Sequence, residues 1–269
     1  MHRSRIRDFR YSIAMAGWAT SQYQVIAHKG DSSRFPENTA SAIESAIKIG
    51  CNVIEVDVSV TRDGYSIALH GPTLEKSTSG YGNAKEYSWN DLQGISARGP
   101  DGKITSEKIS LVENLLRTFG SKTKWNLDLK EGGIGNDLIQ AIRELGLVSN
   151  IVLSGLKLTN ARDVLMANPD FNVLVNLSKV DQFFVATKLL SRLYIKYRFK
   201  ALKKEPSVIA LNMHHRYASK SIIREVHKLG LEIWVYTVDD TDLFNKLFQE
   251  GVDSVTTNSP SEVLNTFRL

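Results

Sequence analysis

Cysteine is almost absent from this sequence, since Cys51 is the single one among 269 residues. One cysteine excludes an internal disulfide and is typical of a protein in a reducing compartment. No run of apolar residues approaches the length needed to span a membrane. We therefore expect a cytoplasmic protein. Export is the alternative, because the basic segment 1–10 and the mildly apolar segment 11–19 loosely resemble a signal peptide.

The signatures of several protein classes are also missing. The sequence has no zinc-finger spacing, basic zipper or basic-aromatic RNA motif, so we expect no nucleic-acid partner. It has no Walker, His-Glu-x-x-His or Gly-x-Ser-x-Gly signature. The net charge of +5 fits an anionic substrate, either a small molecule or a lipid, or an anionic membrane surface. The sequence gives no signal for an oligomeric state.

What the chain does contain is a regular alternation of short apolar strands and amphipathic helices. The predicted strands are 24–28, a second one that starts at Asn52, 124–129, 150–154, 172–177, 207–212, 232–237 and 254–257. The predicted helices follow Thr39 and lie at 111–119, 135–145, 158–168, 181–204, 219–229 and 240–249. Eight such repeats indicate an α/β fold, a closed (β/α)8 TIM barrel. An open doubly wound sheet is the alternative, but no Gly-x-Gly-x-x-Gly follows the first strand.

A hairpin interrupts the alternation after the second strand. Asp63-Gly64 predicts a two-residue loop, whose register would place Asp57 opposite His70. The region that follows, about 71–110, is rich in Gly, Ser and Asn and is too long for a plain loop, so we expect a small inserted subdomain or lid. The domain organisation is therefore an N-terminal extension, 1–22, and one barrel domain, 23–269.

Polar residues gather at the ends of the first three predicted strands. The first strand ends on His28, the second carries Glu55 and Asp57 on one face, and the third carries Asp128 and Lys130. Taken singly, His28 could be a satisfied core histidine, and Asp128 could pair only with Lys130. Three carboxylates at one barrel rim, however, repel one another unless a cation lies among them, and oxygen ligands suit Mg²⁺ or Ca²⁺. The pattern favours a metal site.

These residues also carry a family resemblance. His28-Lys29-Gly30, Pro36-Glu37-Asn38-Thr39, Glu55-Val56-Asp57, Thr61-Arg62-Asp63-Gly64 and His70 resemble the motifs of glycerophosphodiester phosphodiesterases in order and spacing. The segments 126–130, 236–239 and 251–260 are similar to later motifs of the same family. That family has a TIM barrel with an insertion after the hairpin of the second strand.

The resemblance implies a role for each matching residue. It implies that Glu55, Asp57 and Asp128 bind Mg²⁺ or Ca²⁺ and that His28 and His70 are the general acid and base. It implies further that Lys29 and Lys130 neutralise the substrate phosphate, that Glu37 orients the neighbourhood of His28, and that Tyr236 contacts the glycerol or alcohol moiety. The sequence departs from the family pattern at six positions. These are Lys29 for arginine, Gly71 for aspartate, Asp128 for glutamate, Tyr236 for tryptophan, Asp239 for asparagine and Asn258 for aspartate.

The function implied is metal-dependent hydrolysis of glycerophosphodiesters to sn-glycerol 3-phosphate and an alcohol. One histidine would take a proton from water or a substrate hydroxyl while the other protonates the leaving alcohol, and the sequence does not say which does which. The alternatives are lysophospholipase D or sphingomyelinase D-like activity on membrane lysolipids, and a catalytically silent barrel. The Pro-Glu-Asn-Thr and Thr-x-Asp-Gly stretches favour the first function.

The predicted helix 181–204 has a second interpretation. Lys188, Arg192, Lys196, Lys200 and Lys204 recur every four residues and give a basic ridge beside an apolar side. A barrel helix with a solvated outer face explains this pattern. Peripheral contact with an anionic membrane also explains it, with Phe183, Phe184, Ile195 and Phe199 as added apolar surface.

Overall fold

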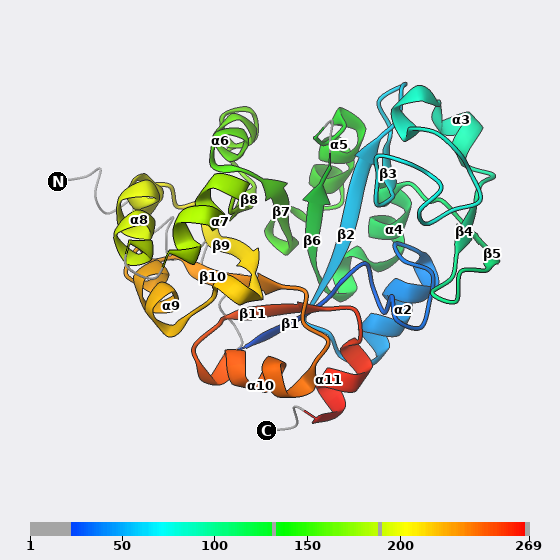
Figure 1. Ribbon diagram of the computed structural model, residues 1–269. Coiled ribbons are helices and arrows are strands. Elements are labelled where there is room, and N and C mark those ends of the chain that lie inside the picture. The colour runs from blue at the N-terminus through cyan, green and yellow to red at the C-terminus, as the bar shows by residue number, and fades with distance from the viewer. Residues whose placement is uncertain (1–22, 131–132, 188–189, 267–269) are drawn as a thin grey trace. The chain divides into compact units, whose positions relative to one another are not determined.

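The strands follow one another in an order that closes a barrel. The structure, a computed structural model, describes residues 23–130, 133–187 and 190–266. Its main sheet has the order β1-β11-β10-β9-β8-β7-β6-β2-β3, with a further pairing between β1 and β2. The barrel strands, labelled in Figure 1, are β1 (Gln24–Ala27), β2 (Val53–Val60), β6 (Lys124–Leu129), β7 (Ile151–Leu156), β8 (Asn172–Asn176), β9 (Val208–His214), β10 (Glu232–Tyr236) and β11 (Ser254–Thr257). The predicted (β/α)8 barrel is confirmed.

Helices follow the strands, as the apolar periodicity predicts. α2 (Ala40–Lys48) begins after Thr39, whose side chain accepts a hydrogen bond from the amide of Ala42, and it buries Ala42, Ile43 and Ala46. Gly50 follows this helix with a φ of +90°, which glycine adopts without steric cost. The further elements are α4 (Val112–Phe119), η2 (Gly120–Lys122), α5 (Asn136–Glu144), η3 (Val148–Asn150), α6 (Leu158–Ala167), η5 (His215–Tyr217), α9 (Lys220–His227), α10 (Thr241–Gln249) and α11 (Pro260–Thr266).

The chain divides into two compact units. Of the described residues, one unit comprises Val152–Thr256 with Tyr23 and Gln24, and the other comprises Val25–Ile151 and 257–266. The second unit contains β1, β2 and β6, and with them every predicted site residue except Tyr236. The predicted N-terminal extension, 1–22, lies outside the described residues.

The hairpin after β2 differs from the prediction by one residue. β3 (Ser66–Ala68) pairs with β2 so that Val58 faces Ala68, and Leu69 donates its amide hydrogen to the carbonyl of Asp57. The expected pairing of Asp57 with His70 is therefore wrong. The reason is a three-residue loop, closed by Thr61 and Tyr65, in place of a two-residue one. In this loop the Thr61 hydroxyl both donates to Asp63 at 2.7 Å and accepts from the Tyr65 amide at 3.0 Å.

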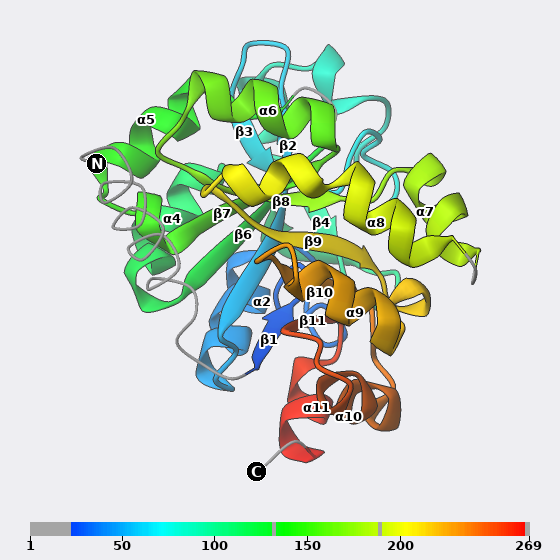
Figure 2. The same cartoon turned by 90° about the vertical axis from the view of Figure 1, so that its left-hand side faces the viewer.

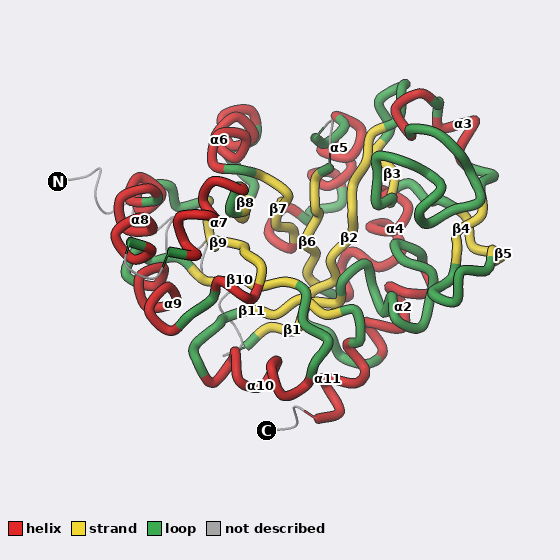
Figure 3. Tube along the Cα trace, in the orientation of Figure 1, coloured by secondary structure: helices red, strands yellow, loops and turns green. Residues whose placement is uncertain are grey.

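Residues 71–110 form a small structure of their own beside the hairpin. Its elements are η1 (Ala84–Glu86), α3 (Trp89–Leu92) and the antiparallel pair β4 (Ser96–Arg98) and β5 (Ile104–Lys108), joined by the loops that make up most of the segment in Figure 3. Leu74, Leu92 and Ile109 pack with Ile67 and Leu69 in one hydrophobic cluster. The inserted segment therefore shares its apolar core with the hairpin that precedes it.

The predicted single helix 181–204 is wrong, because three separate elements occupy this region. They are α7 (Lys179–Ala186), α8 (Ser191–Arg198) and η4 (Lys200–Lys204), and Figure 2 shows α7 next to α8. α7 ends because Thr187 has extended backbone angles and its hydroxyl donates to the carbonyl of Phe184 at 2.6 Å. Ile195 and Phe199 are fully buried, so they add no surface. Lys188 lies outside the described residues.

Within 23–130, 133–187 and 190–266, none of the helices combines the length and the apolar character that crossing a bilayer requires.

The shared core makes a prediction about the insertion. Leu74 is fully buried in the cluster. We expect Leu74→Ala to lower the free energy of unfolding by about 2–5 kcal/mol, because it leaves a cavity. The matched control is Ile104→Ala, since Ile104 is 46% exposed on β5. This control should change stability by no more than about 0.5 kcal/mol. Urea denaturation measures both, and equal effects would show that the cluster does not anchor the insertion.

Candidate active site

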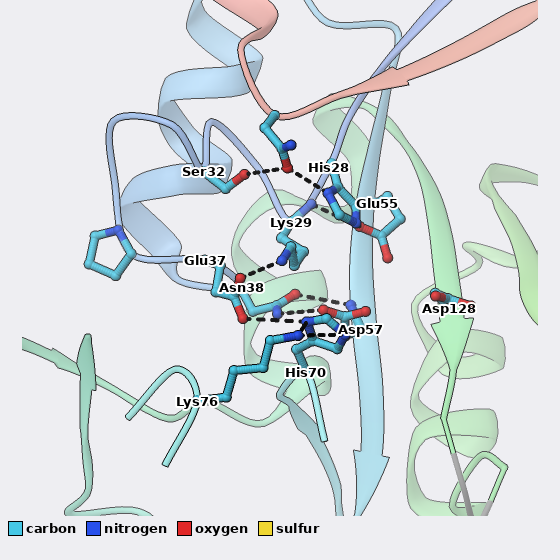
Figure 4. A network of polar contacts seen from close by, with 12 residues as sticks. His28, Lys29, Ser32, Glu37, Asn38, Glu55, Asp57, His70, Lys76 and Asp128 are labelled. Atoms are coloured by element: carbon cyan, nitrogen blue, oxygen red, sulfur yellow. Dashed lines mark hydrogen bonds and ion pairs between the residues drawn. The ribbon is translucent and has the colours of Figure 1, made fainter. Parts of the chain in front are cut away.

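Three carboxylates meet on two neighbouring strands. Glu55 and Asp57 alternate along β2, so both side chains point to one face, and both are buried. Asp57 is in register with Asp128 on the parallel strand β6. One oxygen of each carboxylate lies within 4.8 Å of the others. The structure thus brings together the three predicted metal ligands, which Figure 4 shows on their two strands.

The surroundings of Glu55 oppose its negative charge. Burial, followed by the charges of Asp57 and Asp128, raises the pKa of Glu55 well above its ordinary value. Its Oε2 accepts a hydrogen bond of 2.8 Å from the backbone amide of Lys29. Its Oε1 is buried and has no hydrogen-bond partner among the described residues. A buried acceptor without a donor is costly, and a bound cation would satisfy it.

Lys130 supplies the positive charge beside the other two carboxylates. Its Nζ forms ion pairs with Asp128 and, at 2.6 Å, with Oδ1 of Asp57. Burial by itself would raise the pKa of Asp57, but the charges of Lys130 and His70, together with the hydrogen bonds from Lys130 and Asn38, keep this pKa below its ordinary value. Burial likewise opposes the charge on Lys130, yet the carboxylates around it raise its pKa. Lys130 is therefore protonated and Asp57 is ionised.

His28 follows β1 directly and is fixed by Asn258. Its Nδ1 lies 2.6 Å from Oδ1 of Asn258, and its Nε2 lies 3.9 Å from Oε2 of Glu55. An amide oxygen only accepts, so this contact places the hydrogen of a neutral ring on Nδ1 and leaves the lone pair on Nε2. Burial, reinforced by the charge of Lys29, lowers the pKa of His28 and favours the neutral ring.

His70 lies after the hairpin and faces a different set of charges. Its Nδ1 is 3.8 Å from Oε1 of Glu37, and Nζ of Lys76 is 3.1 and 3.4 Å from its two ring nitrogens. Burial lowers the pKa of His70, and the neighbouring lysines lower it further against the opposing charge of Asp57. Figure 4 shows His70 beside Asp57 and His28 beside Glu55, so the two rings lie at different carboxylates.

An ion pair between Lys29 and Glu37 joins the surroundings of the two histidines. Lys29 has a φ of 59° and only 7% of its surface is exposed. The resemblance implies that Glu37 orients the neighbourhood of His28. In the structure, its carboxylate faces Lys29, which is next to His28, and also His70.

Asn38 holds Asp57 in place through two hydrogen bonds. Its Nδ2 donates to Oδ2 of Asp57 at 2.9 Å, and its Oδ1 accepts from the Asp57 amide at 3.0 Å. Asn38 has a φ of 62°, a left-handed conformation that asparagine tolerates better than most residues. Asn38 directly precedes Thr39, the N-cap of α2, so the start of this helix lies beside the acidic cluster.

Three contacts of the site are not predictable from the sequence. They are those of Asn38 with Asp57, of Asn258 with His28 and of Lys76 with His70. Asn258 is recognisable only as a polar residue at a strand end, and Lys76 lies in the insertion, where no periodicity places it. Tyr236 belongs to the other compact unit, where it ends β10 with its ring centroid 6.2 Å from that of His214. Its predicted contact with the alcohol stays a prediction.

The fold and the site together define a (β/α)8-barrel protein with an acidic cluster and two histidines at the ends of its strands, where such barrels carry their active sites. The model of the glycerophosphoryl diester phosphodiesterase family matches residues 28–262. The chain therefore belongs to this family of phosphoric diester hydrolases.

Individual relatives agree with the family match. The glycerophosphodiester phosphodiesterase of Caldanaerobacter subterraneus is 26% identical over 91% of this chain and 97% of its own length. Among solved structures, a glycerophosphodiester phosphodiesterase from Agrobacterium tumefaciens aligns with a TM-score of 0.74 at 20% identity, covering 90% of this chain and 99% of that one. A phosphodiesterase from Oleispira antarctica, in complex with the product sn-glycerol 3-phosphate, aligns with a TM-score of 0.70 at 20% identity, covering 90% and 95%.

The contacts of Asn38 generate a prediction about stability. Asn38→Ala removes both hydrogen bonds to Asp57 and places alanine at a positive φ. We expect the free energy of unfolding to fall by about 2 kcal/mol or more. Asn38→Gly removes the same hydrogen bonds but tolerates the backbone angle, so it should be more stable than Asn38→Ala by about 1 kcal/mol. Chemical denaturation compares the two, and a wild-type value for Asn38→Ala would contradict the role given to this side chain.

Proposed function

We propose that this protein hydrolyses glycerophosphodiesters to sn-glycerol 3-phosphate and an alcohol with a divalent cation and two histidines. The observation that carries the proposal is the pair of imidazoles placed at the two buried members of the acidic trio, His28 at Glu55 and His70 near Asp57. Membership of the family supplies the reaction class. The sn-glycerol 3-phosphate product is proposed by analogy with the Oleispira antarctica relative, whose complex contains that compound as product.

The donor set fits a hard divalent cation. The partnerless buried Oε1 of Glu55 and the clustered oxygens of Asp57 and Asp128 are the ligands that Mg²⁺ and Ca²⁺ prefer. Glu55, Asp57 and Asp128 would hold the ion, which when bound stabilises the negative charge that develops on the phosphoryl oxygens.

The lysines complete the electrostatic environment for an anionic substrate. The ammonium group of Lys130 is in contact with the carboxylate of Asp57. The ammonium group of Lys29 pairs with Glu37, whose carboxylate lies between the surroundings of the two histidines. A phosphodiester is anionic, so fixed ammonium groups favour its binding and stabilise further charge in the transition state. Lysine provides this charge without the bidentate geometry of arginine.

We assign proton acceptance to His28. Asn258 fixes its Nδ1 hydrogen, so Nε2 is free to accept the proton of the attacking water. The water oxygen forms a bond to phosphorus, and the bond between phosphorus and the alcohol oxygen breaks. The low pKa of His28 keeps the ring neutral before the step.

Proton donation to the leaving alcohol is the complementary role of His70. Its Nδ1 lies 3.8 Å from the Glu37 carboxylate, and the charge of Asp57 favours the protonated ring against the burial and the lysines that lower the pKa of His70 overall. The alcohol oxygen takes this proton as it leaves, so no free alkoxide forms. After the reaction, His28 carries one proton more and His70 one fewer, and exchange with solvent restores both.

We favour this reaction over lysophospholipase D, sphingomyelinase D-like activity or a silent barrel. The family match extends over 28–262, and the acidic trio and both histidines lie in one unit of the chain. A product assay over choline, ethanolamine and inositol esters of glycerophosphate, beside the corresponding lysolipids, identifies the alcohol.

The metal site is tested by binding. Glu55→Gln and Asp128→Asn each replace a charged ligand with a neutral one of the same size. We expect each to weaken Mg²⁺ or Ca²⁺ binding by about 100-fold or more in calorimetry, since changes outside the ligand shell already cost about 10–100-fold. Glu44→Gln is the control, because Glu44 is exposed on α2 and pairs with Lys48. Unchanged affinity in both ligand variants would remove the metal site.

The two histidine roles are separated by the leaving group. On glycerophosphocholine, we expect His28→Ala and His70→Ala each to lower kcat by about 10²–10⁴-fold. The second substrate is the p-nitrophenyl ester of glycerophosphate, whose leaving group needs no proton. On this ester, His70→Ala should have a kcat close to that of wild type, and His28→Ala should not.

His227→Ala is the control for this experiment, because His227 pairs with Asp253 in the other unit and should keep wild-type kcat. Recovery of His28→Ala rather than His70→Ala would reverse the assignment. Full activity of both variants on both esters would overturn the two-histidine mechanism.

A further inference from the structure

Apart from Phe184, which stacks on Tyr194, five large apolar side chains stand exposed on α7, immediately before α8 and on α8. We call them the apolar crest, and they are Val180 (63% exposed), Phe183 (67%), Leu190 (50%), Leu193 (52%) and Tyr197 (65%). Figures 1 and 2 both show α7 and α8 side by side, in yellow-green and yellow. Scattered exposed apolar residues are normal, but such a concentration on two neighbouring helices marks an interaction site.

The crest faces away from the core. Because each residue of a helix advances by about 100°, Leu193 and Tyr197 lie on the side of α8 opposite to Ile195, which is fully buried. The same holds for Phe183 and the buried Val185 on α7. An ordinary barrel helix places polar residues on this outer side. On α7 and α8 the outermost side is apolar.

Asp181 holds the two helices together beneath the crest. It is buried, accepts a hydrogen bond of 2.6 Å from the Tyr194 hydroxyl and forms an ion pair with Arg198 at 3.3 Å. The ring of Tyr194 stacks on that of Phe184, with 4.7 Å between centroids. Burial opposes the charge of Asp181, but its hydrogen bonds with Ser178 and Tyr194 keep the pKa below the ordinary value, so it is ionised. The exposed face is therefore built on a fixed contact between α7 and α8.

Positive charge surrounds the crest. The described residues from Lys179 to Glu205 include seven lysines and arginines, all of them exposed, and two acids, of which one is the buried Asp181. The cations are Lys179, Arg192, Lys196, Arg198, Lys200, Lys203 and Lys204. Nζ of Lys196 lies 5.5 Å from the ring centroid of Tyr197, so a cation is in contact with an aromatic residue of the crest.

We propose that α7, α8 and η4 dock this protein on an anionic lipid bilayer. The apolar crest enters the interfacial region, and the lysines and arginines around it contact the negatively charged head groups. The charge selects this occupant: an anionic surface complements every side of the crest. A second copy of the same chain would bring a like-charged face against it. Tyrosine and phenylalanine beside lysine suit the boundary between water and lipid.

This surface is independent of the proposed reaction, because none of its residues belongs to the predicted site. Docking would determine where in the cell the proposed reaction takes place. A glycerophosphodiester is what remains of a phospholipid after both acyl esters are hydrolysed, so the reactions that supply such a substrate act on lipid. Docking would place the enzyme where its substrate is released.

The test is cosedimentation with vesicles of phosphatidylglycerol and phosphatidylcholine in equal parts, beside vesicles of phosphatidylcholine alone. We expect binding to the anionic vesicles to be tighter by at least about tenfold, and to weaken as salt is added. Phe183→Ser with Leu193→Ser, and separately Lys196→Glu with Lys200→Glu, should each reduce this binding by about tenfold or more.

Matched controls lie elsewhere on the chain. Met166→Ser removes an apolar side chain that is 77% exposed on α6, and Lys246→Glu reverses an exposed charge on α10. Both should bind like wild type. All variants should keep wild-type hydrolysis of a soluble diester and a wild-type melting curve, which shows that they are folded.

Equal weak binding to both kinds of vesicle would overturn the proposal, as would an equal loss in the controls. A dimer in size-exclusion chromatography that the crest variants dissociate, with no vesicle binding by wild type, would assign the surface to a second copy instead.

Discussion

The burial of Glu55 and Asp57 beside the half-buried Asp128, on two neighbouring parallel strands, is the constraint on which the rest of the site depends. Glu55, Asp57 and Asp128 repel one another in surroundings that solvate charge poorly. The neighbouring groups offset the free-energy cost of this repulsion. Lys130 neutralises the two aspartates and Asn38 hydrogen-bonds Asp57, while one buried oxygen of Glu55 has no hydrogen-bond partner among the described residues. The histidines are held in place at the edges of the same cluster.

Much of this arrangement is predictable from the sequence, because it follows from strand periodicity. Glu55 and Asp57 must share one face of β2, and a barrel of parallel strands must bring that face beside Asp128. The predicted bounds 124–129 and 254–257 coincide with β6 and β11. Alternation of apolar and polar residues fixes such elements locally, so no knowledge of tertiary contacts is needed.

The rest depends on contacts that no local pattern contains. Thr61 lengthens the hairpin loop by one residue through hydrogen bonds of its side chain, which the Asp63-Gly64 signal does not reveal. Thr187 ends α7 in the middle of a continuous helical pattern. Asn258 reaches His28 across 230 positions of sequence. In each case a single polar side chain decides the outcome through a partner that the sequence leaves unidentified.

Lys130 has one more consequence. A site that relied on its metal for all of its counter-charge would be unable to assemble before the ion arrived, and folding would then be coupled to metal supply. Here a covalently attached ammonium is already in contact with Asp57 and Asp128. The polypeptide therefore carries an internal substitute for part of the charge of the proposed cation, and folding of the barrel does not have to wait for that cation to bind.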